Sequence, residues 1–91
     1  MLELLGCRFS EDDPQATHYR DGRSYYFWEA RRGRELIHVY VRRAALEDRF
    51  GRAPGERYRQ CLLRSRRDIQ DAANNKWRPG DGEVFLEEND F

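Results

Sequence analysis

The chain has 91 residues, of which 38% are hydrophobic, 37% are charged and 13% are aromatic. This length suits a single domain over residues 1–91, and the aromatic content is too high for a disordered chain. No apolar run approaches the ~20 residues that a membrane-spanning helix needs, and the first residues lack the basic and apolar regions of a signal peptide. We therefore expect a cytoplasmic domain.

The formal net charge is zero, but the charges are distributed unevenly along the chain. Residues 31–67 hold twelve arginines and four acids, a balance of +8, whereas the segments before and after them balance at −3 and −5. Arginine forks pair bidentately with carboxylates and with phosphates. The pattern therefore has two interpretations: internal pairing between an arginine-rich middle and acidic ends, or binding of an external anion.

The first expected elements, in chain order, are short. Residues 7–9 have the composition of a strand and are followed by a turn that contains Pro14. Residues 17–20 are expected to be extended, and the Asp21–Gly22 dipeptide after them is typical of a tight turn.

A β-hairpin is predicted next, because residues 24–30 and 35–41 are rich in aromatic and β-branched side chains around the sequence Arg-Arg-Gly-Arg. A two-residue turn at Arg32–Gly33 would pair Trp28 with Ile37. Alternation then defines one face, expected to be the core face, that holds Ser24, Tyr26, Trp28, Ile37, Val39 and Val41. The second face holds Tyr25, Phe27, His38 and Tyr40.

Two helices follow. Residues 43–50 have helix-forming composition and are closed by Gly51, and residues 54–77 form a longer pattern that starts with Pro54. An apolar stripe at steps of three and four consists of Tyr58, Leu62, Ser65, Ile69, Ala72, Ala73 and Lys76 or Trp77. Residues 83–87 are predicted to form a final short strand. The expected fold is α+β: a small antiparallel sheet packed against one long helix, with a short helix at 43–50.

Three segments of the chain resemble a known family. They are VRRAALEDRFG, RYRQCLLRSRRDIQDAANNKW and DGEVFLEENDF, and they are similar to the junction, helix and closing strand of the bacterial domain of unknown function family 1488. In the helix, the matching positions are Arg66, Ile69, Ala72, Ala73 and Lys76. Arg42 stands where the family commonly has the Ser that would cap the following helix. The resemblance implies a compact α+β protein and brings no catalytic residues with it.

Catalytic and metal-binding residues are not predicted. Cys7, Cys61, His18 and His38 lack the local pairing, such as Cys-x-x-Cys, that structural zinc sites use. The glycines lie in separate turns and form no phosphate-binding loop. We expect no metal, no cofactor and no enzymatic activity.

Two kinds of binding function remain. The leading hypothesis is a non-catalytic interaction or regulatory domain that forms a homodimer or docks a protein partner through Tyr25, Phe27, His38 and Tyr40, since aromatic rings with polar tips suit an interface. Alternatively, the N-terminal segment or the 43–50 helix covers this face. The second hypothesis is weak binding of nucleic acid or another polyanion by Arg31, Arg32, Arg34, Arg57, Arg64 and Arg67, although a pI near 6.7 is low for a dedicated nucleic-acid binder.

Overall fold

The computed structural model describes residues 2–4, 17–20 and 23–91. Its strands are β1 (Glu3–Leu4), β2 (Thr17–Arg20), β3 (Arg23–Arg32), β4 (Glu35–Arg42) and β5 (Glu83–Leu86). Its helices are α1 (Arg43–Asp48), α2 (Tyr58–Arg64) and α3 (Arg66–Lys76), with a 3₁₀ turn, η2 (Glu88–Asp90), near the end. These elements confirm the α+β class. The strand expected at residues 7–9 and the turn at 21–22 lie outside the described residues.

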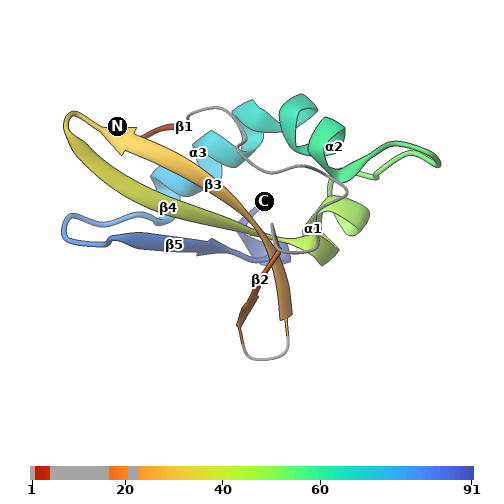
Figure 1. Cartoon of the computed structure of the whole chain (residues 1–91), viewed down its shortest axis with the longest axis horizontal. Coiled ribbons are helices and arrows are strands. Elements are labelled where there is room, and N and C mark those ends of the chain that lie inside the picture. Colours follow the sequence, from red (N-terminus) through yellow and green to blue (C-terminus); the bar gives the residue numbers. More distant parts are fainter. Residues whose placement is uncertain (1, 5–16, 21–22) are drawn as a thin grey trace.

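The strands form one five-stranded sheet (Figure 1). β1 and β2 both pair antiparallel with β3, at its two ends, and β3 pairs antiparallel with β4. β5 pairs with β4 in the parallel sense, so the expectation of a purely antiparallel sheet is wrong on this point. The reason lies in the connection: the chain leaves β4, passes through α1, α2 and α3, and returns beside β4, as a helical crossover between parallel strands requires.

The hairpin forms as predicted, but its register differs. The turn residues are Gly33 and Arg34, so that Arg32 pairs with Glu35 and Trp28 pairs with Val39 instead of Ile37. Hairpin turns that match the strand twist need a positive φ at the first central position, and Gly33 supplies it with a φ of 58°. The pairing moves by two residues, an even number, and the two predicted faces are therefore unchanged.

The single helix expected over residues 54–77 is two helices, and it begins later than predicted. Pro54 and Gly55 occupy the centre of a turn in which the Glu56 N–H donates to the Ala53 carbonyl at 2.9 Å. Gly55 has a φ of 80°, as the third residue of a type II turn requires. Pro54 therefore belongs to a turn that precedes α2 and is not the first residue of the helix.

Ser65 separates α2 from α3. Its ψ of 9° departs from helical geometry, and its side chain is buried. Serine hydroxyls compete with the backbone for helical hydrogen bonds, which weakens a helix at such a position. The break could not be predicted from the sequence, because the apolar stripe continues across Ser65 with the same helical spacing.

α1 is shorter than the expected 43–50 helix, and Phe50 and Gly51 follow its end, with a φ of 57° at Gly51. The Arg42 side chain makes no capping hydrogen bond. It pairs instead with the Glu88 carboxylate at 2.8 Å. The start of α1 is thereby tied to η2.

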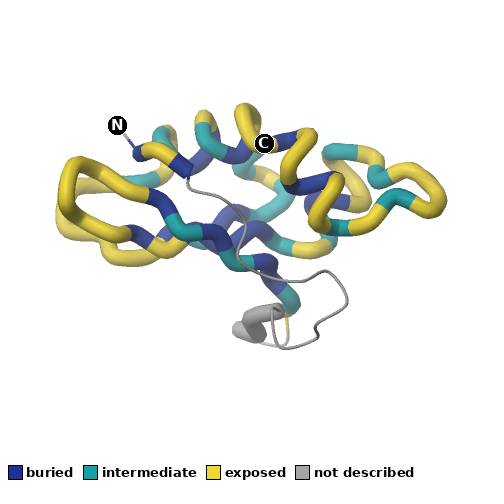
Figure 2. Tube along the Cα trace, turned by 45° about the horizontal axis from the view of Figure 1, so that its top comes forward, coloured by how far each residue is buried: buried dark blue, intermediate teal, exposed yellow. Residues whose placement is uncertain are grey.

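The core lies between the helices and one face of the sheet (Figures 1 and 2). We call this side the core face. Its largest fully buried side chains are those of Trp28, Ile37, Leu46, Leu62, Ile69, Leu86, Val39 and Val41. Leu4 of β1 and Leu2, just before β1, are buried with them. The predicted helix stripe is thus the face that contacts the sheet. The hairpin tip and the loop before α2 are mostly exposed (Figure 2).

Candidate functional site

The side of β3, β4 and β5 that points away from the helices is the outer face of the sheet. Strand register arranges its side chains in rows across the sheet. In order from the hairpin tip, the rows hold Arg31 and Leu36; Glu29, His38 and Glu83; Phe27, Tyr40 and Phe85; Tyr25 and Arg42. All four residues predicted for a partner interface therefore lie together on this face.

Aromatic rings fill the middle of the outer face and contact one another. Tyr40 stacks on Phe85 with ring centroids 4.5 Å apart, and the rings of Tyr25 and Phe85 meet in a T-shaped contact at 5.2 Å. Phe27 contacts His38 at 5.0 Å and Tyr40 at 5.6 Å. Each such pair stabilises the sheet by about 0.5–1.5 kcal/mol beyond the area that it buries.

Two of these rings, those of Tyr25 and Tyr40, are buried, with exposed fractions of 1% and 7%. The Tyr25 hydroxyl donates to the Glu87 carboxylate, which also lies 3.5 Å from the Arg23 guanidinium. Burial raises the pKa of the Tyr25 phenol, and the neighbouring Glu87 carboxylate raises it further. Burial also raises the pKa of Tyr40, with a contribution from the Glu83 carboxylate. Both phenols therefore stay neutral well into the alkaline range.

The rest of the outer face is accessible. Leu36 is 57% exposed, His38 is exposed, and Phe27 and Phe85 are half-buried. Sequence reasoning missed Leu36 and Phe85. Leu36 could have been assigned to the outer face from strand alternation, because it stands two residues before His38. Phe85 could not, because its place beside Tyr40 depends on the parallel pairing of β5.

The six predicted anion-binding arginines fall into two separate groups. Arg31, Arg32 and Arg34 lie at the β3–β4 tip, and Arg57, Arg64 and Arg67 lie on α2 and α3 or directly before α2 (Figure 1). At the tip, Arg31 pairs with the Glu3 carboxylate at 3.9 Å, and Arg32 lies over the Trp77 ring at 4.9 Å. Arg34 is exposed and has no charged partner among the described residues.

Several arginines of the middle segment make internal contacts. Arg43 and Arg52 lie over the Tyr58 ring, at 4.8 and 4.5 Å from its centroid. The Tyr58 hydroxyl donates to Glu47 at 2.5 Å, and Arg52 pairs with the same carboxylate at 3.1 Å. These contacts, with those of Arg31 and Arg42, fit the interpretation of internal charge pairing for part of the arginine-rich segment.

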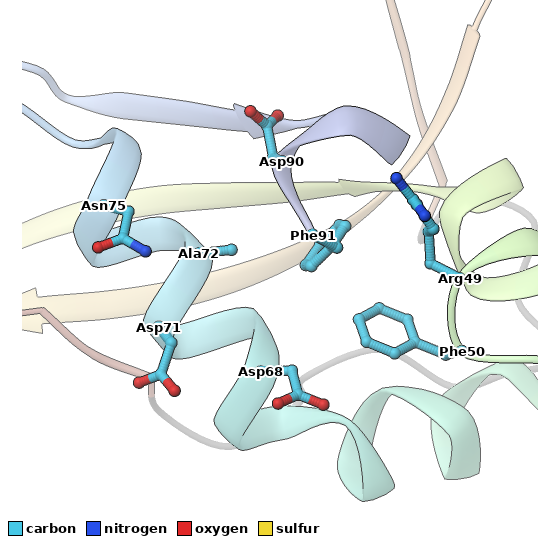
Figure 3. Close-up of a pocket in the computed structure, with 8 residues that line it drawn as sticks. All are labelled: Arg49, Phe50, Asp68, Asp71, Ala72, Asn75, Asp90 and Phe91. Carbon is cyan, nitrogen blue, oxygen red and sulfur yellow. The ribbon is translucent and has the colours of Figure 1, made fainter.

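A pocket of about 390 Å³ lies between the end of α1, one side of α3 and the end of the chain (Figure 3). Phe50 and Phe91 meet in it edge to face at 4.8 Å. Asp68 and Asp71 project from α3 at its border (Figure 3). Asp90 also borders the pocket, and its carboxylate pairs with Lys76 at 2.9 Å. The lining thus combines three carboxylates with the Arg49 guanidinium and two phenyl rings.

Cys61 is a buried free thiol that lies near the Leu46 carbonyl. Burial raises the pKa of this thiol, which keeps it protonated and unreactive at neutral pH. Within residues 2–4, 17–20 and 23–91, no group of three His, Cys, Asp or Glu side chains is placed to hold a metal ion. Cys7 lies outside the described residues, and the side chain of His18 is likewise not described.

Comparison of the chain with protein-family models, with curated proteins and with solved structures finds no match. The resemblance to domain of unknown function family 1488 therefore stays a prediction from the sequence. In the described part of the chain, none of the helices has the length and apolarity to cross a bilayer.

Proposed function

We propose that the protein is an interaction domain that forms a homodimer through the outer face of its sheet. The observation that carries this proposal is the exposure of Leu36, at 57%. The exposed His38 lies in the next row of the outer face, and the half-buried Phe27 and Phe85 lie in the row after that. A solvated sheet face is ordinarily polar, whereas this one is apolar at its centre. Apolar side chains that stay accessible on a sheet face without a covering layer fit an interaction surface.

The charges around the aromatic centre favour a second copy of the chain as the partner. Glu29 and Glu83 flank His38 in one row, and Arg31 follows in the next row with 52% of its side chain exposed. A surface that carries both signs can pair with itself, since a two-fold interface places the same patch on both sides. The two glutamates disfavour a polyanion at this face.

The size of the outer face sets the expected strength of the dimer. Three strands ~4.8 Å apart and four rows ~6.8 Å apart cover roughly 400 Å² of sheet per copy. Stable interfaces bury about 800 Å² per partner. We therefore expect a weak dimer that forms in a concentration-dependent way, in the micromolar range or above.

Sedimentation velocity over a wide concentration range tests this proposal. The wild type is expected to change from monomer to dimer, and Leu36→Asp is expected to remain a monomer, because it places a charge where the most exposed apolar side chain of this face makes its contact. Leu63→Asp is the matched control: Leu63 is 47% exposed but belongs to α2, in the helical layer. A wild type that stays monomeric at the highest concentration contradicts the proposal, as does dissociation by Leu63→Asp alone.

A further inference from the structure

The outer surface of the helical layer carries a concentration of positive charge that the homodimer does not use. Residues 57–67 contain five arginines and no acid. All five are exposed: Arg57, Arg59, Arg64, Arg66 and Arg67. No other segment of this length in the described part of the chain has so high a positive charge without an acid of its own. The outer face of the sheet lies on the opposite side of the molecule from these helices (Figure 1).

Three of these arginines line a groove of about 690 Å³ where α2 and α3 meet β1. Its lining consists of Leu2, Glu3, Leu63, Arg64, Arg66, Arg67 and Gln70. The walls are fixed by hydrogen bonds to β1: Arg66 donates to the Leu4 carbonyl, and the Leu4 N–H donates to the Gln70 side-chain oxygen at 3.1 Å. The groove is therefore held by contacts between segments that are distant in sequence.

The charges inside the groove differ in how far they are neutralised. Arg64 pairs bidentately with the Glu56 carboxylate, at 2.9 and 3.0 Å. The Glu3 carboxylate forms an ion pair with the Arg31 guanidinium, at 3.9 Å. Arg67 has no ion pair with any residue that the structure describes, and Arg66 contacts a neutral carbonyl. Two guanidinium charges thus remain without a carboxylate partner in the described structure.

The acids of α3 lie on its other side. Asp68 and Asp71 border the pocket next to Phe50 and Phe91 (Figure 3), whereas Arg66, Arg67 and Gln70 border the groove. Helical periodicity within α3 produces this separation, because positions 68, 71 and 75 share one side and positions 66, 67 and 70 share another. The basic surface is accordingly not interrupted by the carboxylates that follow it in sequence.

We propose that this groove binds the phosphate groups of a single-stranded nucleic acid, without reading its sequence. Arg66 and Arg67 follow each other at the start of α3, and both line the groove. One strand of a duplex offers a phosphate for every ~3.4 Å along the helix axis, and an extended single strand offers them farther apart, so that a phosphate can meet each arginine in almost any register. The groove offers little for base recognition, since the Gln70 side-chain oxygen already accepts from the backbone.

A nucleic-acid strand fits this surface better than an acidic protein does. Its charges repeat regularly along the whole ligand, whereas an acidic peptide must place its carboxylates opposite particular arginines. Leu63, half-exposed in the groove wall, adds an apolar contact for a sugar or base. Because the whole chain has no net charge, the binding is weak, in the range of 10⁻⁴–10⁻⁶ M that is usual for non-specific complexes at physiological salt.

Fluorescence anisotropy with a labelled oligouridylate of about 20 nucleotides, at several salt concentrations, tests the proposal. For single strands, each phosphate contact contributes about −0.7 to the slope of log K against log salt. Contacts to Arg66 and Arg67, the two arginines of the groove without a carboxylate partner in the described structure, therefore predict a slope of about −1.4. Arg67→Ala is expected to weaken binding and to reduce the steepness of the slope by about 0.7.

The control is Arg34→Ala, which removes an equally exposed arginine at the hairpin tip and is expected to leave affinity and slope unchanged. A labelled polyglutamate peptide of equal charge is the competing ligand. Absence of oligouridylate binding at low salt overturns the proposal. An equal loss of affinity in Arg67→Ala and Arg34→Ala also overturns it. Tighter binding of polyglutamate than of oligouridylate overturns it as well and assigns the groove to an acidic protein. Thermal unfolding of both variants verifies that each is folded.

Discussion

The two faces of the sheet are built from the same strands and differ in what covers them. On the core face, Trp28, Val39 and Ile69 are fully buried between sheet and helices. On the outer face, Tyr25 and Tyr40 are buried by neighbouring rings while Leu36 and His38 stay accessible. The core face combines aliphatic side chains with Tyr26 and Trp28 and is covered by the helices. The centre of the outer face consists of rings, and the hydroxyl of Tyr25 reaches the Glu87 carboxylate. The difference indicates that one face provides stability and the other is available for contact.

The largest expected effect is on the core face. Ile69→Ala and Leu62→Ala are each expected to lower the free energy of unfolding by about 2–5 kcal/mol, because both side chains are buried and each change leaves a cavity. Arg59→Ala, an exposed change on the same helical layer, is expected to stay within about 0.5 kcal/mol. Urea denaturation measures all three. Equal midpoints for Leu62→Ala and Arg59→Ala would refute the assignment of the core face.

An intermediate effect is expected from Tyr25→Phe on the outer face. The change removes the hydroxyl that donates to Glu87, which is expected to lower the free energy of unfolding by about 1 kcal/mol at neutral pH.

The same variant alters the dependence of stability on alkaline pH. The pKa of Tyr25 is raised in the folded state above 10.0, and that of Tyr40 is raised as well. A raised pKa contributes stability that is fully present below the unfolded value and is lost as pH rises through the folded value. Stability should therefore decline above about pH 10, and less so in Tyr25→Phe. Ile69→Val, a core change, serves as the control and should keep the alkaline decline. Identical pH profiles for wild type and Tyr25→Phe would argue against a desolvated Tyr25.

The smallest effect is expected at Leu36. Because its side chain is 57% exposed, Leu36→Ala is expected to change the free energy of unfolding by less than about 0.5 kcal/mol in dilute solution, below the concentrations at which we expect the proposed dimer to form. Leu46→Ala, at a fully buried leucine of α1, is expected to cost about 2–5 kcal/mol under the same conditions. A large loss for Leu36→Ala would mean that the outer face is part of the core of the monomer.

Local periodicity was enough to determine much of this protein from its sequence. The stripe at Leu62, Ile69 and Ala73 repeats with the helix period, and the alternation of Trp28 and Phe27 follows the strand period. Both patterns depend only on backbone geometry within one element, so they assigned the two faces of the hairpin and the buried side of the helices. The two-residue error in register left these faces intact for the same reason.

Tertiary structure decided what depends on contacts between distant segments. The parallel pairing of β5 with β4 brings Phe85 beside Tyr40 and so completes the aromatic row of the outer face. The break at Ser65 and the turn at Pro54 change where α2 lies without changing its stripe. Whether an arginine pairs internally, as Arg64 does with Glu56, or remains available, as Arg67 does among the described residues, likewise depends on which acids the fold brings near. Sequence spacing carries no information about such distances, because the energy of a charge pair depends on separation and exposure in the folded state.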